Sequence, residues 1–357
     1  MTDLFCELVR VAIGTLDSLS RVPTNREWEK LYGIARKQSL VGVCFAGVQK
    51  LCKSESGDYC GMNEMQYLTW MGMAAKISQN HDNMKALEQK LDALFKERGV
   101  KAVLVKGASI ATYYGEPKLR QFGDIDIYSP NDYEAINEII KPVASEYNEE
   151  YYRHSEARVD NVMVENHKFL TDVRGQSRWE KLEQYLSTIA SAKLALVTKG
   201  GVTYPDNMLT LLFFVYHAQA HFIFERISLK FLVDWCVLLQ RTEVPKKVLA
   251  ERLQEFGLMR FAAMLTRVCV GRLGLRAGCV PDAVEAMAAS FSENDVNRFE
   301  ADIFCYDHVG FSSNSLKDRI ERGRGFYRNR WKIEEFLGES IYKFLWNKMV
   351  SIATFKK

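Results

Sequence analysis

The sequence lacks a Cys-x-x-Cys pair among its eight cysteines, so it has no zinc-knuckle ligand spacing. It also lacks a run of about 18 apolar residues, the length that a membrane span requires. The most apolar segment, 209–224, is interrupted by two histidines and a glutamine. The N-terminus has no basic stretch followed by an apolar one, the pattern of a secretory signal. These absences favour a cytoplasmic protein that does not insert into a membrane.

A strong excess of charge is absent as well. The formal net charge is +3, which does not by itself predict binding to nucleic acid or to an anionic membrane. Hydrophobic residues make up 47% of the chain and charged residues 26%, as in soluble globular proteins. At roughly 100–200 residues per domain, the 357 residues predict two or three domains.

The hydrophobic pattern divides the chain into three regions. Residues 1–98 repeat apolar side chains near a period of 3.6, which predicts helices, including a long one over 63–98. Residues 99–204 form a small α/β unit, although the pattern becomes helical again from about Trp179. Residues 205–357 are expected to be helical. The helices predicted in this last region cover 205–224, 228–241, 246–256, 258–273, 295–306 and 333–353.

Acidic residues alternate with apolar ones in the second of three predicted strands, which cover 101–105, 122–128 and 162–170. Asp124 and Asp126 share one face of their strand, roughly 6.6 Å apart. Carboxylates placed in this way can hold the two cations that clamp an in-line displacement at phosphorus, and Mg²⁺ suits that task. A solvated edge-strand face is the alternative interpretation.

A tight turn is predicted just after the first strand. Gly107 lets the backbone approach a ligand or adopt a positive φ. Ser109 can cap the following helix and offer its hydroxyl to a phosphate. Lys106 adds a positive charge beside the N–H groups of the helix start, which favour an anion. The alternative is an ordinary turn capped by Ser109.

Three sequence motifs occur in a fixed order: Val-Leu-Val-Lys-Gly-Ala-Ser at 103–109, Tyr-Tyr-Gly-Glu-Pro at 113–117, and Arg120 followed by Gly-Asp-Ile-Asp-Ile at 123–127. Together they resemble the uncharacterised nucleotidyltransferase family of bacteria, a branch of the DNA polymerase β-like superfamily. The likeness is tightest over 103–128 and looser through about 240. Ala108 separates the glycine from the serine, which are adjacent in the wider superfamily.

The resemblance implies an α+β fold in which a small mixed-sheet nucleotidyltransferase core is flanked by N- and C-terminal helical regions, mostly helical overall. It further implies a nucleoside triphosphate held at the Gly-Ser turn and Mg²⁺ held by Asp124 and Asp126. A third carboxylate should come from a later strand.

Glu165 is our prediction for that third carboxylate. It shares a strand face with His167 and could complete the metal site or act as a general base. His167 resembles the histidine that the family places just after its third acidic strand position, where it could orient the acceptor or a phosphate oxygen. Asp160 and Asp172 are nearby alternatives to Glu165.

Four further residues are candidates for substrate contacts. The guanidinium of Arg120 could reach a phosphate, as the resemblance favours, or pair with an acidic neighbour. His217 and His221 lie one helical turn apart, but the glutamate of a zinc protease motif is absent. The family shows a similar pair followed by an aspartate, here Asp234. We expect an acceptor-side or structural role for these three residues rather than a second metal site.

A basic and aromatic segment lies near the C-terminus. Such a mixture can bind RNA or another polyanion, but with a net charge of only +3 a solvated surface or a cover for the phosphate site is an equal alternative. Its members are Arg319, Arg322, Arg324, Phe326, Tyr327, Arg328, Arg330, Trp331 and Lys332.

These features predict an enzyme that moves a nucleoside monophosphate from an NTP to an acceptor hydroxyl and releases pyrophosphate. Two Mg²⁺ ions, replaceable by Mn²⁺, would be held by Asp124, Asp126 and Glu165. The acceptor, whether small molecule, sugar, protein or RNA, is not specified. A catalytically silent nucleotide-binding module of the same fold and a helical interaction protein are the alternatives.

Overall fold

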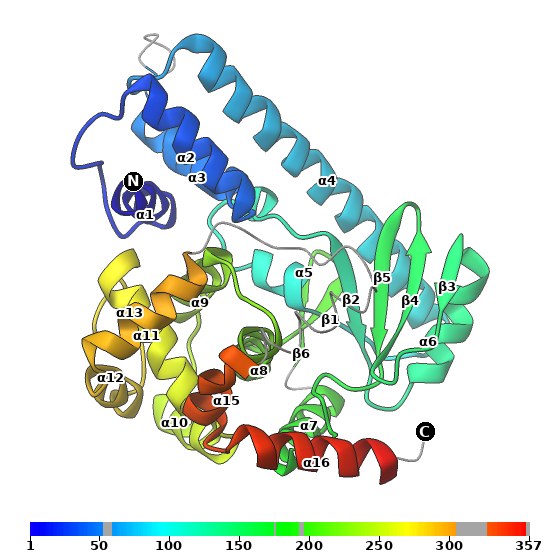
Figure 1. The fold of residues 1–357 in the computed structure, drawn as a ribbon. Helices are drawn as coiled ribbons and strands as arrows, with labels where there is room; N and C mark the ends of the chain where they lie inside the picture. The colour runs from blue at the N-terminus through cyan, green and yellow to red at the C-terminus, as the bar shows by residue number, and fades with distance from the viewer. Residues whose placement is uncertain (53–58, 175, 193–195, 305–326, 355–357) are drawn as a thin grey trace.

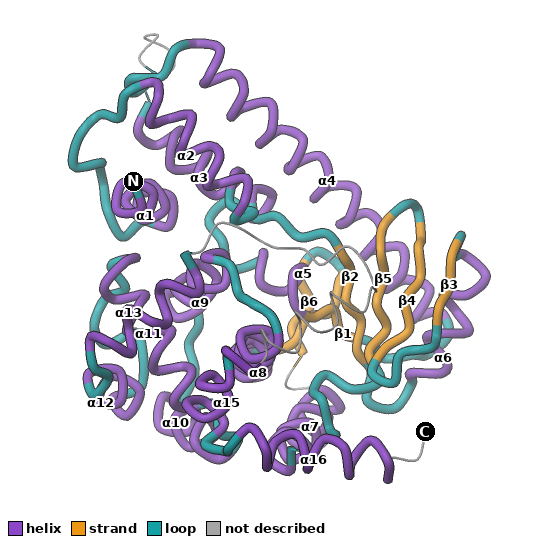
Figure 2. The backbone as a smooth tube through the Cα atoms, viewed as in Figure 1, coloured by secondary structure: helices purple, strands orange, loops and turns teal. Residues whose placement is uncertain are grey.

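In the computed structural model the chain forms a mostly helical body with a small sheet on one side (Figure 1, Figure 2). The structure describes residues 1–357 except 53–58, 175, 193–195, 305–326 and 355–357. The N-terminal helices are α1 (Thr2–Ile13), α2 (Asn25–Lys37), α3 (Val41–Leu51) and α4 (Glu64–Glu97).

The long helix α4 starts and ends where local sequence signals place it. The side chain of Asn63 accepts a hydrogen bond from the backbone N–H of Gln66, and the Gln66 side chain accepts one from the Asn63 backbone in return. This capping box satisfies two N–H groups that the first turn leaves free. Gly99, with a φ of +71°, follows the last turn in a left-handed conformation that glycine adopts without strain.

The sheet is mixed and has the strand order β1-β2-β5-β4-β3. β2 and β5 run parallel, and the other neighbours run antiparallel. Helices α4 and α6 cover one face, where Ile125 and Ile127 of β2 pack against Leu91 and Ile136. The strands and short helices of this region are β1 (Val103–Val105), α5 (Lys106–Ala111), η2 (Pro117–Leu119), β2 (Asp124–Tyr128), α6 (Tyr133–Ile140), η3 (Lys141–Val143), β3 (Glu146–Asn148), β4 (His154–Val159) and β5 (Val162–His167).

The segment from Trp179 to residue 204 is only partly helical, which corrects the sequence prediction. Helix α7 (Ser177–Ser191) is followed by a hairpin of β6 (Leu196–Lys199) and β7 (Val202–Pro205), and β7 lies against β1. Gly200 and Gly201 both have positive φ, as the turn of a two-residue hairpin requires.

The C-terminal helices follow the predicted order with two differences. A helix over 282–289 was not predicted, and the single helix expected over 333–353 is broken at Gly338, where φ is +68°. None of the described helices is long and apolar enough to cross a bilayer. The helices are α8 (Asn207–Phe224), α9 (Leu229–Arg241), α10 (Lys246–Glu255), α11 (Met259–Leu273), α12 (Asp282–Ala289), α13 (Glu293–Ile303), α15 (Arg330–Leu337) and α16 (Ile341–Thr354).

One continuous apolar core joins the N-terminal and C-terminal helices. It includes Leu8 of α1, Trp70 of α4, Trp235 of α9 and Phe299 of α13, all nearly inaccessible to solvent. Burial of such large side chains provides the main stabilisation of the fold, at about 25 cal/mol per Å² of apolar surface. The sheet lies at the edge of this body, and its face opposite α4 and α6 is turned toward α8.

Candidate active site

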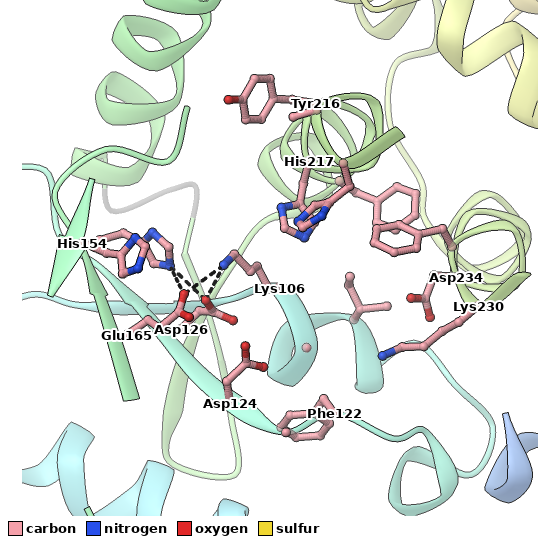
Figure 3. Close-up of a pocket in the computed structure, with 18 of the residues that line it drawn as sticks. Lys106, Phe122, Asp124, Asp126, His154, Glu165, Tyr216, His217, Lys230 and Asp234 are labelled. Atoms are coloured by element: carbon pink, nitrogen blue, oxygen red, sulfur yellow. Dashed lines mark hydrogen bonds and ion pairs between the residues drawn. The ribbon is translucent and has the colours of Figure 1, made fainter. Parts of the chain in front are cut away.

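Three carboxylates meet on the sheet face that α4 and α6 leave uncovered (Figure 3). Asp126 of β2 lies opposite Glu165 of β5 in the parallel register, and Asp124 is two residues earlier on the same face. One oxygen from each of the three lies within 4.8 Å of the others. Ile125 and Ile127 point to the opposite face and are fully buried. The alternation predicted for β2 is therefore confirmed.

The two alternatives to Glu165 lie outside this acidic cluster. Asp160 is in the turn between β4 and β5, where it pairs with Lys90. Asp172 contacts Tyr152 and Lys348. Glu165 is therefore the carboxylate that the fold brings to Asp124 and Asp126.

Lys106 reaches into the acidic cluster from the end of β1. Its Nζ lies 2.6 Å from Asp126 Oδ1 and 3.3 Å from Glu165 Oε2. Burial would lower the pKa of Lys106, but the two carboxylates raise it above its usual value. The backbone of Lys106 has a φ of +51°, a conformation that costs a non-glycine residue on the order of 1 kcal/mol. This strained residue, not Gly107, carries the positive φ at the start of the segment.

The predicted Gly-Ser turn is the first turn of helix α5, which begins directly after β1. A Cβ at Gly107 would lie 2.7 Å from the Cβ of Phe122, so packing against Phe122 requires glycine here. The helix is not capped by Ser109, because Val105 occupies the N-cap position. Ser109 is buried and lines a separate small cavity with Thr210. Its position does not support the predicted phosphate contact.

Arg120 forms a buried bidentate ion pair with Asp234 of α9. Its Nε and Nη2 donate to the two carboxylate oxygens over 3.0 and 2.7 Å, and Nη1 donates to the Gly107 carbonyl over 3.1 Å. The Tyr114 hydroxyl also donates to Asp234, over 2.6 Å. The structure thus agrees with the interpretation that Arg120 pairs with an acidic neighbour. The pair ties the start of α5 to α9, and Asp234 is held by Arg120 and Tyr114 rather than by the helical histidines.

Two imidazoles border the acidic cluster. His167 Nε2 lies 2.9 Å from Asp126 Oδ1 and 3.3 Å from Glu165 Oε2. His154 of β4 is the register partner of His167, with ring centroids 5.4 Å apart. His167 was predicted from the sequence and His154 was not, although His154 and Glu156 alternate with buried residues, which is a strand signal.

The acidic cluster fits a divalent cation. Three carboxylates surround the single ammonium of Lys106, so the acidic groups outnumber the lysine that pairs with them. Burial and Asp126 raise the pKa of Asp124, as expected for anions crowded in a partly dry site. Asp126 Oδ2 is buried and has no hydrogen-bond partner among the described residues. Carboxylate oxygens are the donors that Mg²⁺ prefers.

A family model described as an uncharacterised nucleotidyltransferase matches residues 24–274, more than half of the chain. The chain belongs to this family. Comparison with curated proteins and with solved structures gave no match. The segment shared with the nucleotidyltransferase family contains Lys106, the acidic cluster, both bordering histidines and helices α8 and α9.

The acidic cluster of this family member lies in a pocket of about 520 Å³. The opposite wall comes from α8 and α9 and includes His217 and His221, whose ring centroids are 4.4 Å apart. Burial lowers the pKa of His217 well below its usual value, which favours the neutral ring. Aromatic rings complete this wall: Phe214, Tyr216, Phe224 and Phe231.

Lys230 lies on the α9 side of the pocket and was not singled out from the sequence (Figure 3). It forms no ion pair with any residue in the described part of the chain. Burial, aided by Arg120, lowers the pKa of its ammonium to about 8.

The basic and aromatic segment contributes no described residue to this pocket. Lys332 is fully buried and pairs with Asp302 over 2.7 Å, so it is not available to a polyanion. Arg330 lies against the ring of Tyr327. Arg319, Arg322, Arg324 and Phe326 lie outside the described residues.

Proposed function

We propose that the protein transfers a nucleoside monophosphate from a metal-bound NTP to an acceptor hydroxyl. The single observation that carries this proposal is the meeting of Asp124, Asp126 and Glu165 on two parallel strands at the floor of a pocket. Membership of the nucleotidyltransferase family supports it. The two-metal clamp of phosphoryl chemistry requires such carboxylates side by side and open to substrate.

In this proposal Asp124, Asp126 and Glu165 hold Mg²⁺, with Mn²⁺ as a substitute. When bound, the metal stabilises the charge that develops on the phosphoryl oxygens and activates the attacking hydroxyl. Glu165 serves better as a ligand than as a general base. Burial opposes ionisation, but the His167 hydrogen bond and Lys106 outweigh it and lower the pKa of Glu165 below its usual value.

Charge balance links metal binding to the nucleotide. One divalent cation neutralises the excess of carboxylates over Lys106. A second would leave the site positive unless an anion arrived with it, and a triphosphate brings that negative charge. The Lys106 ammonium, which contacts Asp126 and Glu165 in the structure, can then turn toward a phosphate oxygen on its flexible side chain.

The pocket wall supplies contacts for the rest of the substrates. The ammonium of Lys230 forms no ion pair with a carboxylate of the described residues, so it is available to bind the triphosphate. The rings of α8 and α9 offer flat surfaces on which a nucleobase or a sugar can stack, and such stacking contributes about 1–3 kcal/mol. His217 and His221 offer hydrogen bonds to the acceptor. Arg120 and Asp234 position these walls relative to Lys106.

Thermal unfolding with each NTP, with and without Mg²⁺, tests the binding part of this proposal. We expect stabilisation by at least one NTP that requires Mg²⁺ and is lost in Asp126→Ala but kept in Asp160→Ala, which removes an exposed carboxylate outside the acidic cluster. No response to any nucleotide would refute the proposal and favour a helical interaction protein.

Turnover is tested by incubating the protein with the stabilising NTP and cell extract. We expect release of pyrophosphate and an acceptor whose mass rises by one nucleoside monophosphate. A gain of a bare phosphate would identify a kinase instead. Nucleotide binding without product under any acceptor condition would indicate a catalytically silent module.

A further inference from the structure

A second donor set lies beside the acidic cluster and contains two imidazoles. His154, Glu165 and His167 each offer one ligand atom, and these atoms all lie within 4.8 Å of one another. The antiparallel register of β4 and β5 places the two histidines directly opposite each other. Glu165 belongs to both sets. The sheet therefore presents an all-carboxylate group and, next to it, a group of two histidines and one carboxylate.

The spacing of this second set suits one small ion. His167 Nε2 and Glu165 Oε2 are 3.3 Å apart. Two ligands of a tetrahedral ion, bound at about 2.0–2.1 Å, lie roughly 3.3–3.4 Å from each other. His167 is almost fully buried, whereas Glu165 and His154 are partly exposed on the pocket side. An ion can therefore enter from the pocket, where Glu165 and His154 are partly exposed, and bind His167 at the buried end of the site.

Both imidazoles can present a lone pair to such an ion. His154 Nε2 lies 3.3 Å from Glu156 Oε1, and when that nitrogen carries the proton, Nδ1 is the free donor. A carboxylate behind a ligating histidine is the usual outer contact of protein metal sites. His167 Nε2 lies 2.9 Å from Asp126 Oδ1, which can only accept, so in the metal-free structure Nε2 carries the proton. An ion that binds at Nε2 displaces this proton, and Nδ1, which is buried without a partner among the described residues, can take it.

We propose that His154, Glu165 and His167 bind a first-row transition-metal dication, of the class of Mn²⁺, Co²⁺ or Zn²⁺, distinct from the Mg²⁺ expected at the carboxylates. Imidazole donors favour these metals, whereas Mg²⁺ prefers oxygen. The role of the ion, but not its binding, rests on the proposed transfer reaction: it would polarise the acceptor hydroxyl beside Glu165. The site is then a mixed one, with a hard ion and a softer ion sharing one glutamate.

Titration of the chelator-stripped full-length protein with Co²⁺, in an excess of Mg²⁺, tests the proposal. We expect one Co²⁺ to bind per chain and to give visible ligand-field bands. With Zn²⁺, we expect the X-ray absorption spectrum to show two imidazole ligands. His154→Gln should weaken Co²⁺ binding by at least about 100-fold, and Glu156→Gln by about 10-fold. His221→Gln, which removes an imidazole from the opposite wall, should leave Co²⁺ binding unchanged.

Two results would overturn the proposal: no stoichiometric Co²⁺ binding by the wild-type protein, or wild-type affinity in a folded His154→Gln variant. If His154→Gln does not fold, the milder Glu156→Gln variant replaces it, and unchanged Co²⁺ affinity in that variant would overturn the proposal. The Asp124→Asn variant distinguishes failure of this proposal from failure of the proposed function. It should lose Mg²⁺-dependent stabilisation by NTP, which requires Asp124, and should keep the Co²⁺ ligand-field bands.

Discussion

Asp126 lies directly opposite Glu165 in the parallel pairing of β2 with β5. Two carboxylates 39 positions apart in the sequence are therefore neighbours on adjacent strands. The Lys106 ammonium contacts both. The repulsion between the acids is therefore reduced by a side chain of the same chain before any ion binds. Because Asp126, Glu165 and Lys106 contact one another, a substitution of any one of them should change the stability or the metal binding of the site that the three share.

Glu165→Gln should reduce nucleotidyl transfer by at least about 100-fold, because it removes one metal ligand while keeping the shape of the side chain. Asp160→Asn is the matched control, since Asp160 is an exposed residue in the turn between β4 and β5 and pairs with Lys90. Steady-state rates of pyrophosphate release measure both variants. Equal losses in the two variants, or full activity in Glu165→Gln, would contradict the assignment of the third carboxylate.

Lys106→Met should destabilise the metal-free protein by about 2 kcal/mol, less than the full cost of breaking a buried ion pair, because Lys106 and Glu165 are partly exposed. The midpoint of thermal unfolding should fall by roughly 3 °C. Mg²⁺ should restore more stability in this variant than in the wild type, since the ion replaces the missing cation. Lys118→Met, which breaks the exposed pair with Asp82, should show neither effect.

Arg120→Ala should reduce the free energy of unfolding by about 3–5 kcal/mol, because it leaves Asp234 buried without its bidentate partner. The Gly107 carbonyl also loses its donor, so NTP affinity should fall in parallel. Arg267→Ala removes an exposed pair with Glu293 and should cost about 0–1 kcal/mol. Denaturant unfolding compares the two. A loss below about 1 kcal/mol in Arg120→Ala would show that the pair does not hold α5 to α9.

Lys230 should make nucleotide affinity depend on mildly alkaline pH. Burial and Arg120 lower its pKa to about 8, while Asp234 and Asp124 act in the opposite direction. Its ammonium is charged below that pH and loses its proton as the pH rises through it. Calorimetric affinity for the Mg–NTP complex should therefore fall roughly 10-fold above about pH 8, as one charge-assisted contact is lost. Lys230→Arg should bind with little change over the same range, and an identical fall in that variant would exclude Lys230 as the cause.

The acidic cluster could be predicted from the sequence because its signal is local. Two aspartates alternate with buried isoleucines, and the same period of two places Glu165 with His167. The family match over 24–274 agrees with the resemblance seen in those motifs. The mixed sheet between helical regions was predicted correctly as well.

The contacts that complete the pocket depend on distant parts of the chain. Arg120 and Asp234 are 114 positions apart, and nothing near Arg120 indicates that its partner lies on α9. His154 becomes a site residue only because β4 pairs with β5. The hairpin at Gly200 was missed for another reason: its flanking strands are short, so helical periodicity in α7 dominated the interpretation.

The division of labour between the sheet and helices α8 and α9 has an evolutionary consequence. The carboxylates proposed to hold the metal come from β2 and β5, whereas the rings and imidazoles proposed to contact the acceptor come from α8 and α9, later in the chain. Mutations in that pair can alter which compound is accepted without disturbing the reactive groups. Related genes could thus diversify their targets while inheriting the same chemistry.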